Sequence, residues 1–343
     1  LSESKKKAII EKIASNETHL LIGTHALIED RVKFKDLGLV IIDEQHRFGV
    51  EQRAKLWMRQ QPPHVLVMTA TPIPRTLAMT LYGDLDVSVI DELPAGRKPI
   101  KTMHLFDSSR LRVIGFMKEQ IKLGRQIYIV FPLIEESEKL DLQNLMDGYD
   151  NIRKDFPLPE YFVSMVHGKM KAKEKEQEME LFANGKTHIM IATTVIEVGV
   201  NVPNATVMII ENAERFGLSQ LHQLRGRVGR GAEQSFCILM SGNKLSADGR
   251  ERLKTMVQTN DGFQIAETDL KLRGPGDITG IQQSGLLNLK IAELAKDGAI
   301  LELARNAVIH ILKDDPLLNS EENKILNRQL HQLREQPNWS KVS

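Results

Sequence analysis

The stretch LVIIDEQH, at residues 39–46, joins four aliphatic residues directly to four polar ones. Three of the aliphatic residues are β-branched, which is typical of a strand that is buried on both faces. Strands of this kind build parallel sheets, whose ligands bind beyond the carboxyl ends of the strands. The stretch therefore predicts an α/β fold with Asp43 and Glu44 at the ligand-binding edge of a sheet.

Short aliphatic runs of the same kind recur before residue 241, and polar segments with helical spacing separate most of them. Strands that alternate with helices predict parallel α/β sheets. We expect further strands at residues 20–22, 65–68, 127–130, 162–166, 189–191, 207–210 and 236–240, and helices at 50–60, 74–82, 111–123 and 170–183.

The length of 343 residues predicts two or three domains, because it exceeds the usual size of one compact domain. The segment LPAGRKP, at 93–99, has two prolines and a glycine, as interdomain connections often do. After residue 241 the strand pattern ends, and helical spacing surrounds the turn LRGPGD at 272–277. We therefore place domains at 1–96, 97–242 and 243–343, the last one mostly helical.

Composition excludes several classes of protein. The hydrophobic content is 41%, and no apolar stretch approaches the roughly 20 residues that span a bilayer, so no membrane partner is expected. The amino-terminal residues are not followed by an apolar block of signal-peptide length, so nothing marks the chain for export. Cys237 is the single cysteine of the sequence, which excludes an internal disulfide. We expect a cytoplasmic protein with Cys237 as a small hydrophobe in a buried strand. The first residue is not methionine, which suggests that a longer protein contains this chain.

Charge is nearly balanced overall but not locally. The net charge is +1, whereas residues 97–125 hold eight Lys or Arg against two acidic residues. Such a surplus fits contact with a phosphate backbone, and it fits a solvated helix face equally well.

Two neighbouring strand ends carry groups suited to nucleotide hydrolysis. In a nucleotide hydrolase, a carboxylate such as Asp43 holds Mg²⁺ through its water shell, and a second one such as Glu44 accepts a proton from the attacking water. The strand at 65–68 ends in TATPIPR, where Thr69 and Thr71 can relay a change at Mg²⁺ to another domain. The alternatives are a solvated acidic loop at the first site and a helix N-cap at Thr71.

A third group of polar residues lies in QLHQLRGRVGR, at 220–230. Its three arginines repel one another unless an anion or several carboxylates draw them together. Guanidinium groups aimed at a γ-phosphate stabilise the charge that develops in phosphoryl transfer. An RNA-binding Arg-Gly tract is the alternative, although such tracts lie in low-complexity sequence.

Together with ATTVIEVGVNVP at 192–203, these blocks resemble motifs II, III, V and VI of the superfamily 2 helicases. The tripeptide Gly23-Thr24-His25 resembles the block of that superfamily that holds a nucleic-acid backbone. Within the superfamily, DEQHRFGVEQR at 43–53 and GFQIAETDLKLRGPGDITGIQQSG at 262–285 are similar to the RecG family of branched-DNA helicases. Transcription-repair coupling factors share part of this pattern and rank second.

The resemblance implies tandem RecA-like domains, the first one partial, and a helical translocation segment. It implies a motor that uses ATP and Mg²⁺ and acts as a monomer on branched DNA, such as replication forks and Holliday junctions, in repair and recombination. It assigns catalysis to Asp43, Glu44, Gln223, Arg227 and Arg230, nucleotide binding or coupling to Gln45, His46, Thr69, Thr71, Glu197, Gly199 and Asn201, and DNA binding or translocation to Gly23, Thr24, His25, Thr193, Thr194, Arg273 and Gln283.

The chain departs from the family pattern in two places. No phosphate-binding loop G-x-x-x-x-G-K-[ST] occurs, because Gly185-Lys186-Thr187 has Glu180 where the first glycine belongs. We expect that this loop and the amino-terminal wedge of the family belong to a preceding part, and that this chain alone does not hydrolyse ATP. Asn201 stands where motif V usually has aspartate. A non-catalytic DNA-binding or interaction module that has kept helicase architecture is the alternative function.

Overall fold

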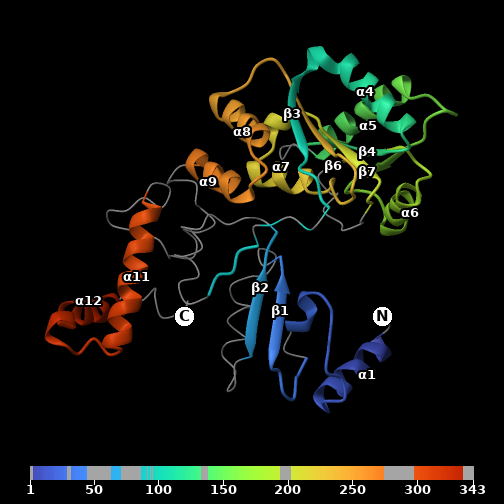
Figure 1. Cartoon of the computed structure of the whole chain (residues 1–343). Helices are drawn as coiled ribbons and strands as arrows, with labels where there is room; N and C mark the ends of the chain where they lie inside the picture. Colours follow the sequence, from blue (N-terminus) through green and yellow to red (C-terminus); the bar gives the residue numbers. More distant parts are fainter. Residues whose placement is uncertain are drawn as a thin grey trace. The chain divides into compact units, whose positions relative to one another are not determined.

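The computed structural model describes residues 3–28, 32–44, 63–70, 86–90, 92, 94, 96–132, 138–193, 202–273 and 297–334. The chain forms two compact units, shown in Figure 1. The first contains Leu1–Thr71 and Asn319–Ser343, and the second contains Pro72–Leu318.

The first unit contains a short parallel sheet. Strands β1 (Leu39–Asp43) and β2 (His64–Met68) pair in register from Leu39 with His64 to Asp43 with Met68. Both follow the aliphatic runs predicted from the sequence. The unit also contains helices α1 (Glu3–Ala14), η1 (His25–Ile28), η6 (Glu321–Asn323) and α12 (Lys324–Arg334).

The prediction of a strand at residues 20–22 is wrong. These residues are irregular, and the side chains of Leu20 and Ile22 are 77% and 86% exposed. A strand needs a neighbour to pair its backbone groups. Among the described residues of this unit only β1 and β2 pair, so a three-residue aliphatic run there forms no ladder.

The second unit is built on a six-stranded sheet with the order β3-β8-β7-β4-β6-β5. All of its strand pairs are parallel, as alternating strands and helices predict. The strands are β3 (Lys101–Phe106), β4 (Gln126–Phe131), β5 (Val163–Val166), β6 (Ile189–Thr193), β7 (Ala205–Ile210) and β8 (Phe236–Ser241).

Helices cover both faces of this sheet (Figure 1). One face packs on α4 (Arg110–Lys122) and α5 (Glu138–Asp155), and the apolar cluster there includes Ile127 and Ile129 of β4. The other face, with Tyr128 and Val130, packs on α6 (Ala172–Ala183), α7 (Leu218–Arg225), α8 (Ala247–Gln258) and α9 (Gly262–Arg273). The alternation of inward residues along β4 therefore explains the three layers.

Strand β3 was not predicted, because the run KTMHLF contains three polar residues, whereas the predicted strands were aliphatic runs, and because it lies beside a basic linker. It is an edge strand, and its residues alternate in exposure. Cys237 lies fully buried in β8, as predicted, and burial raises the pKa of its thiol to about 12.

Helices follow β8, which confirms the predicted helical carboxy-terminal segment. After α8 and α9 come α11 (Gly298–Asp314) in the second unit and α12 in the first. No strand follows Ser241 within the described ranges. Within the same ranges, no helix has both the length and the apolarity that a membrane crossing requires.

Candidate nucleotide and nucleic-acid site

Asp43 and Glu44 lie at the carboxyl end of β1, where the sequence predicted them. The Asp43 side chain is exposed, and its Oδ1 accepts a hydrogen bond of 3.0 Å from the Glu44 backbone N–H. Glu44 has a φ of 53°, a left-handed conformation that residues other than glycine seldom adopt. The backbone therefore turns sharply at Glu44, directly after the strand, and the Asp43 carboxylate stabilises this turn.

Thr69 lies at the same edge of this sheet. It follows β2 directly, and Met68 pairs with Asp43 in the parallel ladder. The structure thus brings the predicted residues Asp43, Glu44 and Thr69 together. Gln45, His46 and Thr71 lie outside the described residues.

The predicted DNA-backbone block opens a short helix in the same unit. Gly23 and Thr24 are exposed, and the Thr24 carbonyl accepts a bond of 3.0 Å from the Leu27 backbone N–H at the start of η1. A Cβ atom on Gly23 would lie 3.0 Å from Leu27 Cδ1, so the local packing favours glycine. His25 is the first residue of η1.

Residues 223–230, here called the arginine segment, begin on α7 and continue beyond its end. Leu221 and Leu224 of α7 are buried, and Val228 is buried further along, so apolar contacts hold the segment at both ends. Gly229 has a φ of 77°, and a Cβ atom there would lie 2.9 Å from Ile100 Cγ1. Backbone conformation and packing therefore both require glycine at this turn.

Arg227 and Arg230 are half-buried. Burial raises the pKa of the Tyr128 hydroxyl to about 12, while the charges of Arg230 and Arg227 oppose the rise. Both guanidinium charges therefore act on the same buried hydroxyl and contribute to a positive local potential. Gln223 is half-buried on the preceding helix.

Arg225 has a different role from the other two arginines. It is 2% exposed, and its Nη1 donates to the backbone oxygens of Met256 and Thr259, both at 2.9 Å. Its Nη2 lies 3.2 Å from His222 Nδ1. The expectation that an anion or several carboxylates hold the three arginines together is therefore wrong for Arg225, whose backbone contacts tie the arginine segment to the end of α8.

His222 completes this buried contact and was not predicted from the sequence. Burial, assisted by the Arg225 charge, lowers the pKa of His222 to about 4. The imidazole is therefore neutral at pH 7, and its Nδ1 can accept from Arg225. The (i, i+3) spacing of the two residues on α7 is the signal from which the contact was predictable.

The remaining predicted residues fall at the ends of elements. Thr193 is the last residue of β6 and pairs with Phe131 of β4; its side chain is 3% exposed, and its hydroxyl has no hydrogen-bond partner in the described part of the chain. Arg273 is the last residue of α9. Thr194, Glu197, Gly199, Asn201 and Gln283 lie outside the described residues.

Three family models match successive parts of this chain. The DEAD/DEAH box helicase family matches residues 1–80, and the helicase conserved C-terminal domain matches 110–232. Domain 3, C-terminal, of the ATP-dependent DNA helicase RecG matches 259–343.

Curated relatives agree with these models. The ATP-dependent DNA helicase RecG of Bacillus subtilis (strain 168) is 52% identical over 326 residues, which are 95% of this chain. That of Aquifex aeolicus (strain VF5) is 50% identical over 327 residues, or 93% of this chain. The chain belongs to the RecG family. It spans about half the length of these relatives, 48% of the first and 41% of the second.

Solved structures support the same assignment. The structure of RecG bound to a three-way DNA junction is 43% identical with a TM-score of 0.65, and the match covers 88% of this chain and 38% of that one. Mycobacterium smegmatis helicase Lhr bound to ssDNA and AMP-PNP is 16% identical with a TM-score of 0.51, covers 76% of this chain and 36% of its own, and shows the fold alone. The predicted fold class and RecG family are confirmed.

The donor set at β1 fits a hydrated Mg²⁺. Within the described ranges, no group of three His, Cys, Asp or Glu side chains could enclose a metal ion. Mg²⁺ keeps several waters and binds through one or two carboxylates plus substrate phosphates, so the exposed Asp43 suits it. In the RecG family assignment, Asp43 is therefore the residue that would hold the ion.

Proposed function

We propose that this chain is the motor part of an ATP-dependent DNA helicase or translocase that acts on branched DNA in repair and recombination. The observation that carries the proposal is the arginine segment, in which Arg225 is buried and bonded to the end of α8 while Arg227 and Arg230 remain half-buried, and the charges of both act on Tyr128. Relatives named ATP-dependent DNA helicase RecG and a RecG structure bound to a three-way DNA junction support it.

In this proposal the catalytic groups come from separate parts of the sequence. Asp43 would hold Mg²⁺ through water, and the ion would supply positive charge to the phosphates. Glu44 accepts the proton of the attacking water, and its fixed turn keeps the carboxylate at the strand end. Gln223, Arg227 and Arg230 bind the γ-phosphate and stabilise the charge that develops on it. The residues proposed for nucleotide binding or coupling are Gln45, His46, Thr69, Thr71, Glu197, Gly199 and Asn201.

In this proposal the protein moves along DNA because two domains bind the DNA backbone alternately. We assign the domains to 1–96, 97–242 and 243–343. Residues 23–25 of the first domain and Thr193 and Thr194 of the second would hold backbone phosphates in turn as ATP closes and opens the pair. Thr193 is buried in this structure, so its contact requires the end of β6 to open.

The carboxy-terminal segment couples hydrolysis to movement in this proposal. The Arg225 bonds to Met256 and Thr259 support a physical path, because they join the arginine segment to the chain that leads into α9. Arg273 ends α9, and Gln283 follows in the segment that resembles the translocation motif. These two residues would transmit the closure of the two domains to the DNA.

We also propose that the protein is a cytoplasmic monomer.

The test is ATP hydrolysis in a chimera. This chain would replace the matching segment of the Bacillus subtilis relative, which is 52% identical to it. We expect DNA-stimulated hydrolysis and unwinding of a three-way junction, and loss of both in Glu44→Gln, because an amide cannot accept the proton. The 343-residue chain alone, whose sequence contains no G-x-x-x-x-G-K-[ST], should bind DNA without turnover.

Two results would contradict the proposal. A well-folded chimera that binds the junction but never hydrolyses ATP would favour the non-catalytic binding module. Normal turnover in Glu44→Gln would show that another group is the base.

A further inference from the structure

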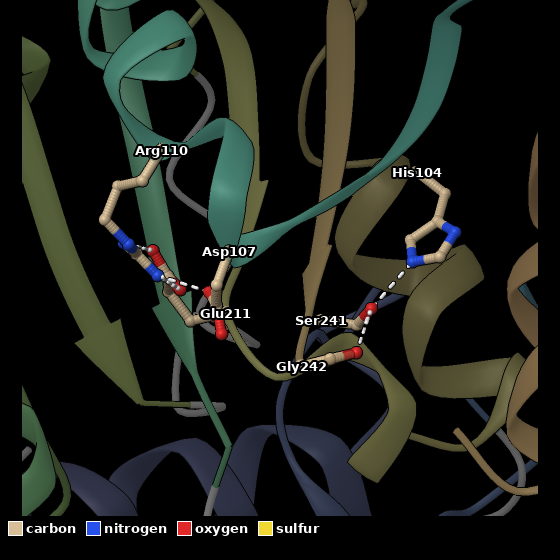
Figure 2. A network of polar contacts seen from close by, with 6 residues as sticks. All are labelled: His104, Asp107, Arg110, Glu211, Ser241 and Gly242. Carbon is tan, nitrogen blue, oxygen red and sulfur yellow. Dashed lines mark hydrogen bonds and ion pairs between the residues drawn. The ribbon is translucent and has the colours of Figure 1, made fainter. Parts of the chain in front are cut away.

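A bidentate ion pair lies at the carboxyl ends of the strands in the second unit (Figure 2). Arg110 Nη1 donates to Glu211 Oε1 and Arg110 Nη2 donates to Glu211 Oε2, both at 2.8 Å. Nη2 also donates to Asp107 Oδ1 at 2.9 Å. The three residues come from two elements that are about 100 positions apart in the chain, so their meeting is a property of the fold.

The carboxylate of this pair is buried, whereas the guanidinium is not. The Glu211 side chain is 7% exposed and that of Arg110 is 44% exposed. The hydrogen bonds to Glu211, opposed by partial burial and supported by Asp107, raise the pKa of Arg110. A buried carboxylate without its partner is strongly unfavourable, so Glu211 depends on Arg110 to keep its place.

Glu211 is the residue at which β7 turns toward the arginine segment. Its backbone N–H donates to Val130 O at 2.8 Å, which fixes it to the neighbouring strand β4. Asn212 follows with a φ of 48° and a ψ of 49°, a left-handed conformation that the surroundings must maintain. The short helix η5 (Ala213–Arg215) and then α7 continue from this turn.

The segment that precedes Arg110 is held in place by contacts with β8. Arg110 begins α4 directly after β3 and the 3₁₀ turn η3 (Asp107–Ser109). His104 Nε2 of β3 lies 2.7 Å from Ser241 Oγ at the end of β8, and that hydroxyl donates to Gly242 O at 3.2 Å (Figure 2). The side-chain contact between β3 and β8 therefore holds the start of α4 in register with the sheet.

We propose that Arg110 and Glu211 form a clamp that positions the arginine segment by fixing the turn after β7. Arg110 is then a positioning residue, because it acts on Arg227 and Arg230 only through Glu211, Asn212 and η5. This inference rests on the proposed function, in which the arginine segment acts on ATP. The basic surplus at residues 97–125 thus contains at least one arginine that serves the fold of the site.

The experiment measures amide hydrogen exchange by mass spectrometry on the 343-residue chain. In Arg110→Ala, peptides that cover 211–225 should exchange on the order of 10-fold faster or more, whereas peptides of α5 and α6 should not change. Arg125→Ala is the control for loss of a salt bridge, because Arg125 pairs with the exposed Glu233, at 2.7 Å, beside the amino end of β4. It should leave 211–225 protected.

A double variant separates positioning from charge balance. Arg110→Ala combined with Glu211→Gln removes the unpaired buried carboxylate, so its melting temperature should return toward that of the parent chain. If the pair is a clamp, 211–225 still exchanges fast in the double variant. If protection and melting temperature recover together, the pair only balances charge and the proposal is wrong. Should Arg110→Ala fail to fold, Arg110→Lys, which keeps one charge and loses the fork, takes its place.

The same variants in the chimera link the clamp to catalysis. We expect kcat for DNA-stimulated hydrolysis to fall at least 10-fold in the double variant, with KM for ATP little changed. Faster exchange at 211–225 without any fall in kcat would overturn the positioning role. A parent chimera that does not hydrolyse ATP would instead contradict the proposed function, and the exchange result would still decide the clamp.

Discussion

Arg225 and the pair Arg227 and Arg230 lie within six residues, yet the fold treats them in opposite ways. Arg225 is 2% exposed and bonds to two backbone oxygens, whereas the other two are half-buried. The difference follows from the helix: Arg225 is the last residue of α7 and faces α8, while the others follow the helix. Neighbouring residues of one type in one motif can therefore serve structure and chemistry separately.

The largest effect should come from substitution of Arg227 or Arg230. In the chimera, Arg227→Lys or Arg230→Lys keeps the charge and loses the planar fork, so the rate of ATP hydrolysis should fall on the order of 10³-fold. The melting temperature should stay within error of the parent. A salt-sensitive loss of DNA binding with intact hydrolysis would make these residues backbone contacts instead.

Substitution of the buried Arg225 should instead lower the stability of the fold. Arg225→Ala leaves the oxygens of Met256 and Thr259 without their donor and opens a cavity, which should lower the free energy of unfolding by about 3 kcal/mol. Urea denaturation of the 343-residue chain measures it, with Arg227→Ala as the control. Equal destabilisation by both variants would remove the distinction.

Because His222 is neutral in its contact with Arg225, the stability of the folded chain depends on pH. An unfolded histidine titrates near 6.5, whereas His222 titrates at about 4 in the folded chain. Between these values only the unfolded chain takes up the proton, so the stability is complete above pH 6.5 and is lost as the pH falls toward 4. The loss should be about 2 kcal/mol after allowance for partial exposure.

Urea denaturation at several pH values checks this dependence. His222→Asn keeps an acceptor close to the position of Nδ1 and cannot titrate, so its stability should change less over the same range. An identical pH profile in the variant would show that another group is responsible.

The smallest effect should arise at Gly229, in the turn between Arg227 and Arg230. Gly229→Ala forces a side chain into a left-handed conformation and against Ile100, which should cost about 1–2 kcal/mol of stability. Gly226→Ala is a suitable control, because a Cβ there meets nothing closer than 3.4 Å and φ is negative. Equal melting temperatures for the two variants would contradict the packing argument.

The sequence predicted strands made of aliphatic runs better than strands that contain polar residues. Runs such as those at 189–191 and 207–210 became β6 and β7, because a strand buried on both faces has to be aliphatic throughout. Strand β3 was missed, since an edge strand tolerates polar residues, and 20–22 was wrongly predicted, since an aliphatic run forms a strand only beside a partner.

The site was predictable where chemistry is local and was not where it depends on distant contacts. Asp43 and Glu44 lie at a strand end because they directly follow the aliphatic run. The contacts of Arg225 with Thr259 and of Arg110 with Glu211 join residues 34 and 101 positions apart, and no local pattern encodes them. The sequence therefore assigned a task to Arg227 and Arg230 but none to Arg225 or Arg110.

The position of β3 has a consequence for synthesis of the chain. Strand β3 lies at the edge of the sheet and pairs with β8. Lys101 therefore cannot pair with Phe236 until β8 has been synthesised. Strands β4 to β7 and the arginine segment leave the ribosome before β8 does. A nascent chain can therefore pair β4 with β6 and β7 while β3 still exposes unpaired backbone, and β8 completes the sheet as the last strand made.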